Sequence, residues 1–308
     1  MNSFRMDAND FLDRDRVEAH EALTRWQSAP ELQSNLESEW DAFIQRVGVD
    51  REPLLLDIDG LGAAVAFRNA DPRTSQEPYA VVRHRSFGIQ THTDAATLAR
   101  ALREAFGDSV SRGIVYEASP STTEKFDASS ALARAPISEP EKRYLAAPIV
   151  QLREATRPRF ANRVVAERAT DLSFYDEYSD AYDRFHEAKP ELRTLVPKES
   201  LDDMRKYLEA RGVYHIRVDG EWAGIIAATP DVEVGLRGWR FRERLLTAKF
   251  RGQKLGPASL DAFIRAIEAA PRDMLFGEIH AKNTPSYKSA RALGRVDVGG
   301  WFWLDLPR

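Results

Sequence analysis

The 308-residue chain contains no cysteine, which excludes disulfides, thiolate metal sites and a cysteine nucleophile. Its six histidines are scattered without a paired spacing, so we expect no metal site. No apolar run approaches the roughly 18 residues that span a bilayer. The first residues, MNSFRMDANDFLDRD, carry acids early and have no apolar core, unlike a secretory signal. These absences predict a cytoplasmic protein without a membrane partner.

The sequence also lacks a basic excess. The net charge of −4 argues against a nucleic-acid partner and is compatible with a cationic amine substrate. Hydrophobic content of 43% and charged content of 30% are typical of a soluble globular protein. The length allows two domains of ordinary size.

The most informative stretch covers residues 243–260, ERLLTAKFRGQKLGPASL. A strand-like run passes through a short loop and opens a helix with an apolar stripe formed by Leu260, Phe263, Ile264 and Ile267. A glycine-bearing loop at a helix N-terminus directs backbone N–H groups at one point, where the helix dipole favours an anion. The stretch therefore suggests a phosphate site, although an ordinary strand-to-helix turn with a basic surface would read the same way.

The elements expected in the first half are two helices within 13–47, a hairpin of 54–58 and 63–67, a strand at 79–90, a helix at 94–106 capped by Thr93, and a strand at 113–118. Those expected in the second half are a strand at 164–168, a helix capped by Asp171, a helix that begins at Ser200, a hairpin of 213–218 and 222–228, and strands at 274–281 and 301–306.

The two halves contain an internal repeat. The turn Asp59-Gly60 aligns with Asp219-Gly220 at an offset of 160, and ALAR at 131–134 aligns with ALGR at 292–295 at an offset of 161. The strand, helix and strand between them follow the same order, which indicates a duplicated unit. Prolines concentrate between 120 and 162 and place the junction near 138–162. We expect domains at 1–140 and 163–308, with a linker at 141–162.

The segment FRGQKLGPASL resembles the acyl-CoA loop of the GCN5-related N-acetyltransferase family, whose pattern is Arg or Gln, two residues, Gly, one residue, then Gly or Ala. Arg251 and Gly256 match, whereas Lys254 replaces the middle glycine. A second frame, on Gln253, Gly256 and Ala258, satisfies the pattern two residues later. The first frame is preferred because Phe250 and Arg251 fit the family's strand-to-loop transition. Lys254 either limits close backbone approach or adds a cation for the pyrophosphate.

The resemblance extends over about 163–308. ERATDLSFYDEY is similar to the family's first strand and helix, VYHIRVDGEWAGIIAA to its second and third strands, and EIHAKNTPSYKSARALGR to its fifth strand and next helix. The implied fold is α+β, with two GNAT-like domains, each a mixed, mostly antiparallel sheet flanked by helices and splayed between its fourth and fifth strands. The first copy is degenerate, because SFGIQTHTDAATL lacks the basic-glycine pattern and is expected to bind no CoA.

The resemblance implies N-acylation of a primary amine, on a small molecule or amino-acid-like metabolite, with acetyl-CoA as the expected donor. It places the donor's anchor at the backbone N–H groups of 253–256, with charge from Arg251 and Lys254. It also assigns polarisation of the thioester carbonyl to the N–H of Leu246. The residues expected to contact the donor are Leu245, Leu246, Thr247, Arg251, Gly252, Gln253, Lys254, Leu255, Gly256, Pro257, Ala258, Asn283 and Ser286.

Glu243 is the expected catalytic base. In an extended strand it would share a face with Trp239, Phe241 and Leu245, where burial raises the pKa of a carboxyl toward neutrality. The alternative is a carboxylate paired with a cross-strand arginine. Glu233, in an expected loop, is the reserve.

The general acid is where the chain departs from the family. Many members carry a tyrosine seven residues after the asparagine, and here that position is Ala290. Tyr287 and Ser286 are the candidate catalytic acids, although Tyr287 could be structural and the thiolate could leave unaided. The rival functions are a non-catalytic acyl-CoA-binding or partner-binding protein, and an aminoacyl-tRNA-dependent transferase, which the net negative charge disfavours.

Overall fold

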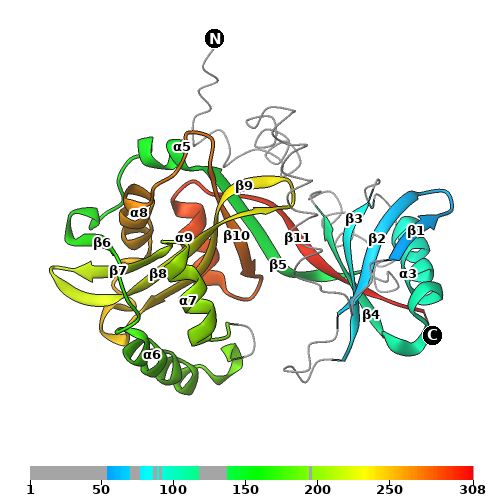
Figure 1. Ribbon diagram of the computed structural model, residues 1–308, viewed down its shortest axis with the longest axis horizontal. Helices are drawn as coiled ribbons and strands as arrows, with labels where there is room; N and C mark the ends of the chain where they lie inside the picture. The colour runs from blue at the N-terminus through cyan, green and yellow to red at the C-terminus, as the bar shows by residue number, and fades with distance from the viewer. Residues whose placement is uncertain are drawn as a thin grey trace, which may run out of the picture. The chain divides into compact units, whose positions relative to one another are not determined.

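The computed structural model describes residues 54–69, 77–85, 89, 92–117, 137–193 and 196–307 (Figure 1). The two helices expected within 13–47 lie outside these residues. The described chain divides into two compact units. Unit 1 contains Leu145–Asp297, and unit 2 contains the described residues up to Tyr144 and those from Val298 onward.

Unit 1 is built on a mixed sheet with the strand order β5-β10-β9-β8-β7-β6. Its strands are β5 (Ile137–Pro148), which belongs to unit 1 only from Leu145 onward, followed by β6 (Val164–Arg168), β7 (Val213–Val218), β8 (Glu221–Glu233), β9 (Leu236–Leu246) and β10 (Met274–His280). Strands β6 to β9 pair antiparallel in succession, and β10 runs parallel to β9. This arrangement confirms the expected mixed, mostly antiparallel sheet.

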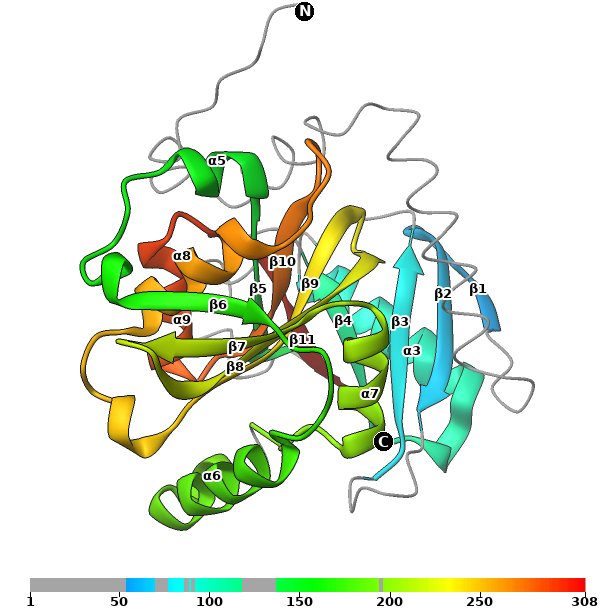
Figure 2. The ribbon, with the colours of Figure 1, turned by 60° about the vertical axis from the view of Figure 1, so that its left-hand side comes forward.

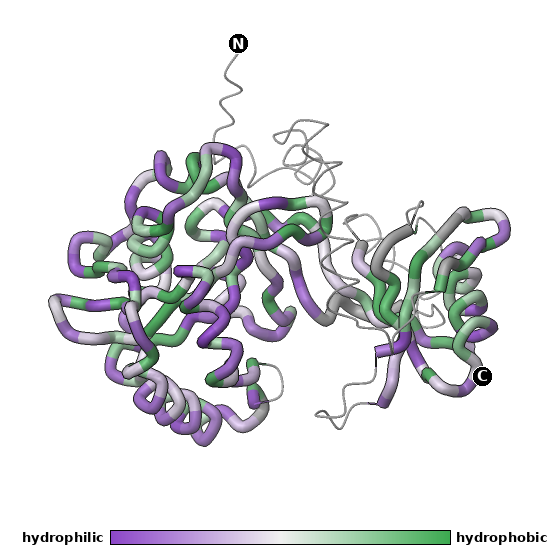
Figure 3. Tube along the Cα trace, viewed as in Figure 1, coloured by the Kyte–Doolittle hydropathy of each residue, from purple (hydrophilic) through white to green (hydrophobic). Residues whose placement is uncertain are grey.

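Helices cover both faces of this sheet (Figures 1 and 2). Helices α5 (Ile149–Glu154) and α8 (Gly256–Ala266) pack on one face, and α6 (Tyr175–Ala188) and α7 (Leu201–Glu209) pack on the other. Helix α9 (Thr284–Ala292) packs beside α8. The predicted apolar stripe of α8 is buried in the hydrophobic core between α8 and the sheet. Helix α6, in contrast, is largely hydrophilic along its length (Figure 3). A helix begins at Ser200 as predicted, and the Ser200 hydroxyl caps α7 by accepting a 3.0 Å hydrogen bond from the N–H of Asp203. The predicted cap of α6 was wrong, because that helix begins at Tyr175 and its N-cap residue is Phe174 rather than Asp171.

Unit 2 has the strand order β1-β2-β3-β4-β11. Its elements are β1 (Leu54–Ile58), β2 (Gly62–Asn69), β3 (Tyr79–Arg85), α3 (His92–Phe106), β4 (Arg112–Glu117) and β11 (Val296–Asp305). Strands β1, β2 and β3 pair antiparallel, and β4 runs parallel to β3. Helix α3 buries Leu98 and Leu102 against this sheet. The helix begins at His92, so Thr93, predicted as its cap, lies inside it.

The two units repeat one topology. Each contains an antiparallel hairpin, a third strand antiparallel to it, a helix, and a strand parallel to the third. Each third strand carries one extra residue, Arg83 in β3 and Arg242 in β9, at positions 159 residues apart. A bulge at matching positions supports the predicted duplication, because bulges are specific features of a strand pair. The other match, at 131–134, lies outside the described residues.

The units divide at different residues from those predicted. The segment 141–162, expected to be a linker, contains the end of β5 and all of α5. Residues 298–308, expected in the second domain, group with unit 2, because β11 pairs antiparallel with β4 from Gly300 opposite Glu117 to Asp305 opposite Arg112. Strand pairing between segments so distant in sequence depends on tertiary structure, and local patterns do not reveal it.

Candidate active site

A bulge in β9 decides where Glu243 points. Phe241 lies opposite Ala228 and Glu243 lies opposite Ala227, so Arg242 has no counterpart on β8. Phe241 packs in the core under α8, whereas Leu245 packs in the core under α6 and α7. The expectation that Glu243 shares a face with Trp239 and Phe241 was therefore wrong. The extra residue reverses the alternation and turns Glu243 toward α6.

Two tyrosines of α6 hold the Glu243 carboxyl. The hydroxyl of Tyr178 donates to Oε2 at 2.9 Å, and the hydroxyl of Tyr182 lies 3.1 Å from Oε1 and 3.0 Å from Oε2. The backbone N–H of Arg244 donates to Oε1 at 2.6 Å. Glu243 is 6% exposed, and no arginine side chain forms an ion pair with its carboxyl in the described part of the chain. The alternative of a cross-strand arginine pair is thus not what the structure contains.

Burial raises the pKa of Glu243 from 4.5 to about 7. The hydrogen bonds from Tyr178 and Tyr182 favour the carboxylate and oppose this rise, while the negative charge of Glu199 adds to it. Both tyrosines, buried beside the carboxyl, have pKa values raised far above their usual range and stay protonated. The site therefore offers a carboxyl that exchanges a proton near neutral pH.

The segment before α7 orients these groups. The N–H of Glu199 donates to the Tyr178 hydroxyl at 3.0 Å, so the single proton of that hydroxyl is directed toward Glu243. Tyr175 donates to the Glu199 carbonyl at 3.0 Å, and Tyr207 donates to its carboxylate at 3.0 Å. Sequence reasoning missed this tyrosine set. Its one local signal is the four-residue spacing of Tyr178 and Tyr182, which places both on one helix face.

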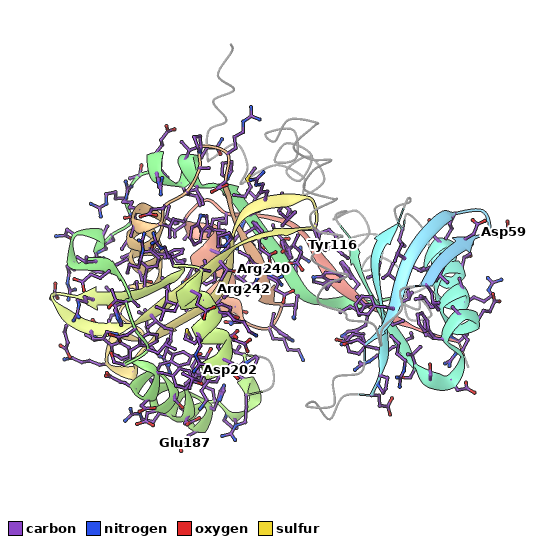
Figure 4. The ribbon with its side chains drawn as sticks, in the orientation of Figure 1. Asp59, Tyr116, Glu187, Asp202, Arg240 and Arg242 are labelled. Carbon is purple, nitrogen blue, oxygen red and sulfur yellow. The ribbon has the colours of Figure 1, made fainter. Side chains whose placement is uncertain are left out.

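Two arginines of β9, Arg240 and Arg242, pair with acidic residues other than Glu243 (both arginines are labelled in Figure 4). Arg242 donates to Thr229 Oγ1 at 2.9 Å and pairs with Asp231 at 2.7 Å. Arg240 pairs with Glu233 at 2.8 Å. Glu233, the reserve base, was expected in a solvated loop, but it ends β8 and is 4% exposed. A carboxylate in a buried ion pair is a poor proton acceptor, because the neighbouring cation stabilises its charged form.

The ladder between β9 and β10 is short and covers Met274 to Phe276, with Phe276 opposite Arg240. Both strands continue beyond it, β9 to Leu246 and β10 to His280, and this stretch beyond the ladder is called the opening below. On the other side of β9 the ladder continues, and the N–H of Thr247 donates to the carbonyl of Ala223 at 2.8 Å. Because the bonds of an antiparallel ladder alternate, the N–H of Leu246 points away from β8 toward the opening. This is the orientation expected of a donor for a thioester carbonyl.

The loop after β9 leads into an uncapped helix. Leu255 at the N-cap of α8 makes no side-chain hydrogen bond, and the first turn contains no acidic residue. Pro257 at N1 or N2 of the helix lacks an N–H. Within the loop, Gly252 and Lys254 have φ values of 76° and 59°. Lys254 thus keeps the left-handed backbone that a glycine would adopt, and an uncapped N-terminus follows it, which suits a phosphate group.

The expected donor contacts surround this opening. Leu245, Leu255 and Ala258 are buried, Gly252, Gln253 and Lys254 are exposed, and Leu246, Thr247, Gly256 and Pro257 are partly exposed. Arg251 differs from its expected role. Its Nε donates to the Leu246 carbonyl at 2.6 Å, and its guanidinium lies 4.6 Å over the Phe185 ring of α6. These contacts direct the charge of Arg251 toward α6 rather than toward the start of α8.

Helix α9 carries the other candidates. The Asn283 side chain caps it by accepting from the N–H of Ser286 at 3.4 Å. The Tyr287 hydroxyl donates to Asp297 Oδ2 at 3.0 Å, a contact that fits its structural alternative. The Ser286 hydroxyl accepts from Arg244 Nη2 at 3.4 Å and keeps its own proton to donate. Ala290 is buried and offers no polar group.

Three features of the described residues indicate which kinds of ligand the chain could bind. No group of acidic and histidine side chains among the described residues could hold a metal ion. No helix in the described ranges is long and apolar enough to cross a membrane. The start of α8, which no side chain caps, and the stretch of β9 beyond its pairing with β10 suit a molecule that combines a phosphate group with an extended arm.

No family profile and no curated protein matches the chain. Among solved structures, it is similar to a GCN5-related N-acetyltransferase from Kribbella flavida, with 15% identity, 88% of this chain and 96% of that chain covered, and a TM-score of 0.47. A GNAT-family acetyltransferase from Colwellia psychrerythraea has 9% identity, 79% and 86% coverage and a TM-score of 0.46. A tandem GNAT protein from the clavulanic acid pathway has 16% identity, 80% coverage of both chains and a TM-score of 0.43.

The topology of unit 1 can be compared directly with the fold that the sequence implied. Its mixed sheet and the early end of the β9–β10 pairing are features that the sequence resemblance implied, and the parallel β9-α8-β10 crossover is an additional finding. Unit 2 repeats the same order of hairpin, strand, helix and parallel strand. The chain therefore contains two copies of one mixed-sheet topology, which is the tandem arrangement that the sequence predicted.

Proposed function

We propose that the protein is an acyl-CoA-dependent N-acyltransferase with one working site, in unit 1. The expected donor is acetyl-CoA and the acceptor is the primary amine of a small molecule or amino-acid-like metabolite. One observation supports the proposal most directly. The carboxyl of Glu243 is buried, its pKa is about 7, and it lies on β9 beyond the part of that strand that pairs with β10. A group of this kind is poised to take a proton from an ammonium at neutral pH.

The residues of the site suit direct attack on a thioester. The amine nitrogen forms a C–N bond to the carbonyl carbon, the C–S bond breaks, and the thiol leaves as a thiolate. Glu243 accepts the proton of the ammonium, and the hydroxyls of Tyr178 and Tyr182 stabilise the carboxylate before the transfer. The N–H of Leu246 is the proposed donor to the carbonyl oxygen, where negative charge develops.

Ser286 is the better-placed group for the leaving thiolate. The hydroxyl of Tyr287 already donates to Asp297, whereas the proton of Ser286 is available. The first turn of α8 would hold the donor's diphosphate through backbone N–H groups, since no side chain caps it. A lysine at 254 keeps the required backbone conformation and leaves its own side chain in solvent.

The proposal is tested by release of free thiol from acetyl-CoA over a panel of primary amines. Glu243→Gln should lower the rate at least about a hundredfold, because general-base catalysis of this kind contributes about 10² to 10⁴. The matched control is Glu187→Gln, an exposed carboxyl on α6 that should leave the rate unchanged. Saturable acetyl-CoA binding without thiol release for any amine would support the non-catalytic alternative and end the enzyme proposal.

A further inference from the structure

The charge of the Arg244 side chain has no role in the proposed function, although its backbone N–H holds Glu243 and its Nη2 contacts Ser286. Arg244 lies on β9 two residues before the strand ends, and its side chain reaches the helices opposite α6, where Nη2 contacts Ser286 Oγ at 3.4 Å. Part of the residue remains exposed, but its Nη1 atom is buried and has no hydrogen-bond partner. Such an atom is unusual, since buried polar groups in native proteins are nearly always paired.

The guanidinium also lacks an ion-pair partner. No ion pair joins Arg244 to an acidic residue within the described ranges of the chain. The adjacent Glu243 has its carboxyl on the opposite face of the strand, between the tyrosines of α6. Burial lowers the pKa of Arg244 to about 10, and the negative charge of Glu243 opposes this lowering only in part. A buried cation without an ion-pair partner destabilises the ligand-free protein. The presence of Arg244 at this position would be explained if a bound anion pairs with it.

Two helix N-termini converge on this cation. A Cβ built on Gly256, the first residue of α8, would lie 3.6 Å from Arg244 Nη1 and 2.9 Å from Ser289 Oγ. Ser286, the partner of Nη2, lies in the first turn of α9. Neither first turn contains an acidic residue. The positive ends of two helix dipoles and a guanidinium thus meet, and within the described ranges no acidic side chain forms an ion pair with that guanidinium.

The other cations of the loop are differently placed. Arg251 donates to the Leu246 carbonyl and lies over Phe185, on the α6 side. Lys254 is exposed and strongly hydrated. Arg244 has already lost part of its hydration, so an anion that reaches Nη1 gains a charge-assisted hydrogen bond in a low-dielectric environment.

We propose that Arg244 is the internal counter-charge of the donor site and that its guanidinium binds the diphosphate of an acyl-CoA seated on the first turn of α8. This inference rests on the proposed function for the identity of the donor. The inference assigns most of the electrostatic contribution to donor binding to Arg244 on β9. Arg251 and Lys254, the cations of the loop, would contribute less.

The first test uses the two halves of the donor. Calorimetric titration of CoA, of adenosine 3′-phosphate 5′-diphosphate and of S-acetylpantetheine is carried out on the full chain and on Arg244→Met. Both diphosphate-bearing ligands should bind about tenfold or more weakly to the variant, and S-acetylpantetheine should bind equally. Arg244→Lys, which keeps the charge without the planar fork, should lose less.

The second test separates a ligand-binding arginine from a structural one. Removal of an uncompensated buried charge should raise the melting temperature of the ligand-free protein, so Arg244→Met should be more stable than the wild type and should gain less stability from CoA. The matched control is Arg265→Met, which removes an arginine that pairs with Asp261 on the same helix α8. That control should be less stable and should bind CoA as the wild type does.

The outcomes are distinct. Equal CoA binding by Arg244→Met and the wild type would overturn the inference while leaving the proposed function intact. Equal weakening for S-acetylpantetheine would place the contact on the pantetheine arm and overturn the diphosphate assignment. If Arg244→Met does not fold, unchanged affinities in Arg244→Lys and no thermal stabilisation of the wild type by inorganic pyrophosphate would overturn it as well. A wild type that binds no CoA would fail the proposed function itself.

Discussion

The hydroxyl of Tyr182 lies within 3.1 Å of both oxygens of Glu243. One phenolic proton is therefore shared between two acceptors, and the carboxyl is held along its whole edge. This contact and the bond from Tyr178 favour the carboxylate, while burial favours the neutral acid. The balance leaves the pKa of Glu243 at about 7, where a change in either contribution alters the proton affinity measurably.

The activity should depend on pH through Glu243. Because only the carboxylate accepts a proton, kcat/KM is expected to fall about tenfold per pH unit below a pKa of about 7 and to level off above it. Thiol release measured from pH 5 to 9 tests this. A flat profile across that range would remove Glu243 from the role of base.

Tyr182→Phe should move that profile. Loss of a donor to the carboxylate raises the pKa of Glu243 further, so the acidic limb is expected to shift upward by about half a unit to one unit. Tyr175→Phe is the control, because its hydroxyl contacts the Glu199 carbonyl and not Glu243. Identical shifts in the two variants would mean that the effect comes from movement of the segment before α7.

Stability should depend on pH in the opposite sense from activity. The pKa of Glu243 is raised in the folded state, from 4.5 to about 7, so its contribution is complete below pH 4.5 and is lost as pH rises through 7. The loss is about 3 kcal/mol at most. Urea unfolding should show that Glu243→Gln, which cannot ionise, loses less stability than the wild type between pH 4.5 and 8.

Gly224→Ala should disrupt unit 1. Its φ is 143°, and a Cβ there would lie 2.0 Å from the Leu245 carbonyl oxygen, next to the site on β9. A loss of more than about 3 kcal/mol is expected. Gly220→Ala, at the hairpin turn with φ of 83° and no atom within 4 Å of the added Cβ, should cost only about 1 kcal/mol. Equal urea midpoints for the two variants would contradict the crowding argument.

Gly256→Ala should weaken donor binding through crowding at the start of α8. The added Cβ would meet Ser289 Oγ at 2.9 Å. A several-fold loss of CoA affinity is expected by calorimetry, and Ser289→Ala in the same chain should restore most of it. Gly252→Ala is the local comparison, since its Cβ meets no atom within 4 Å and only its φ of 76° opposes the substitution. Failure of the second mutation to restore binding would assign the loss to the helix backbone instead.

Local patterns in the sequence were sufficient for much of the fold. The Asp219-Gly220 hairpin, the apolar stripe of α8 and the helix start at Ser200 depend on interactions between near neighbours, and the structure contains each. The strand, loop and helix across 243–260 also follow from residues close in sequence, as does the position of Glu243 on β9. The duplicated order of elements was visible for the same reason, because both copies keep the same local signals.

Tertiary structure alone decided the direction of the functional side chains. One unpaired residue, Arg242, reverses the faces of β9, and no local preference marks it, since the strand reads as regular alternation. The partners of Glu243, the contact of Arg251 with Phe185 and the unpaired end of Arg244 all follow from which helix packs on which face. The sequence by itself therefore determined the elements and the candidate base, whereas packing between distant segments determined which charges are buried, paired or left open.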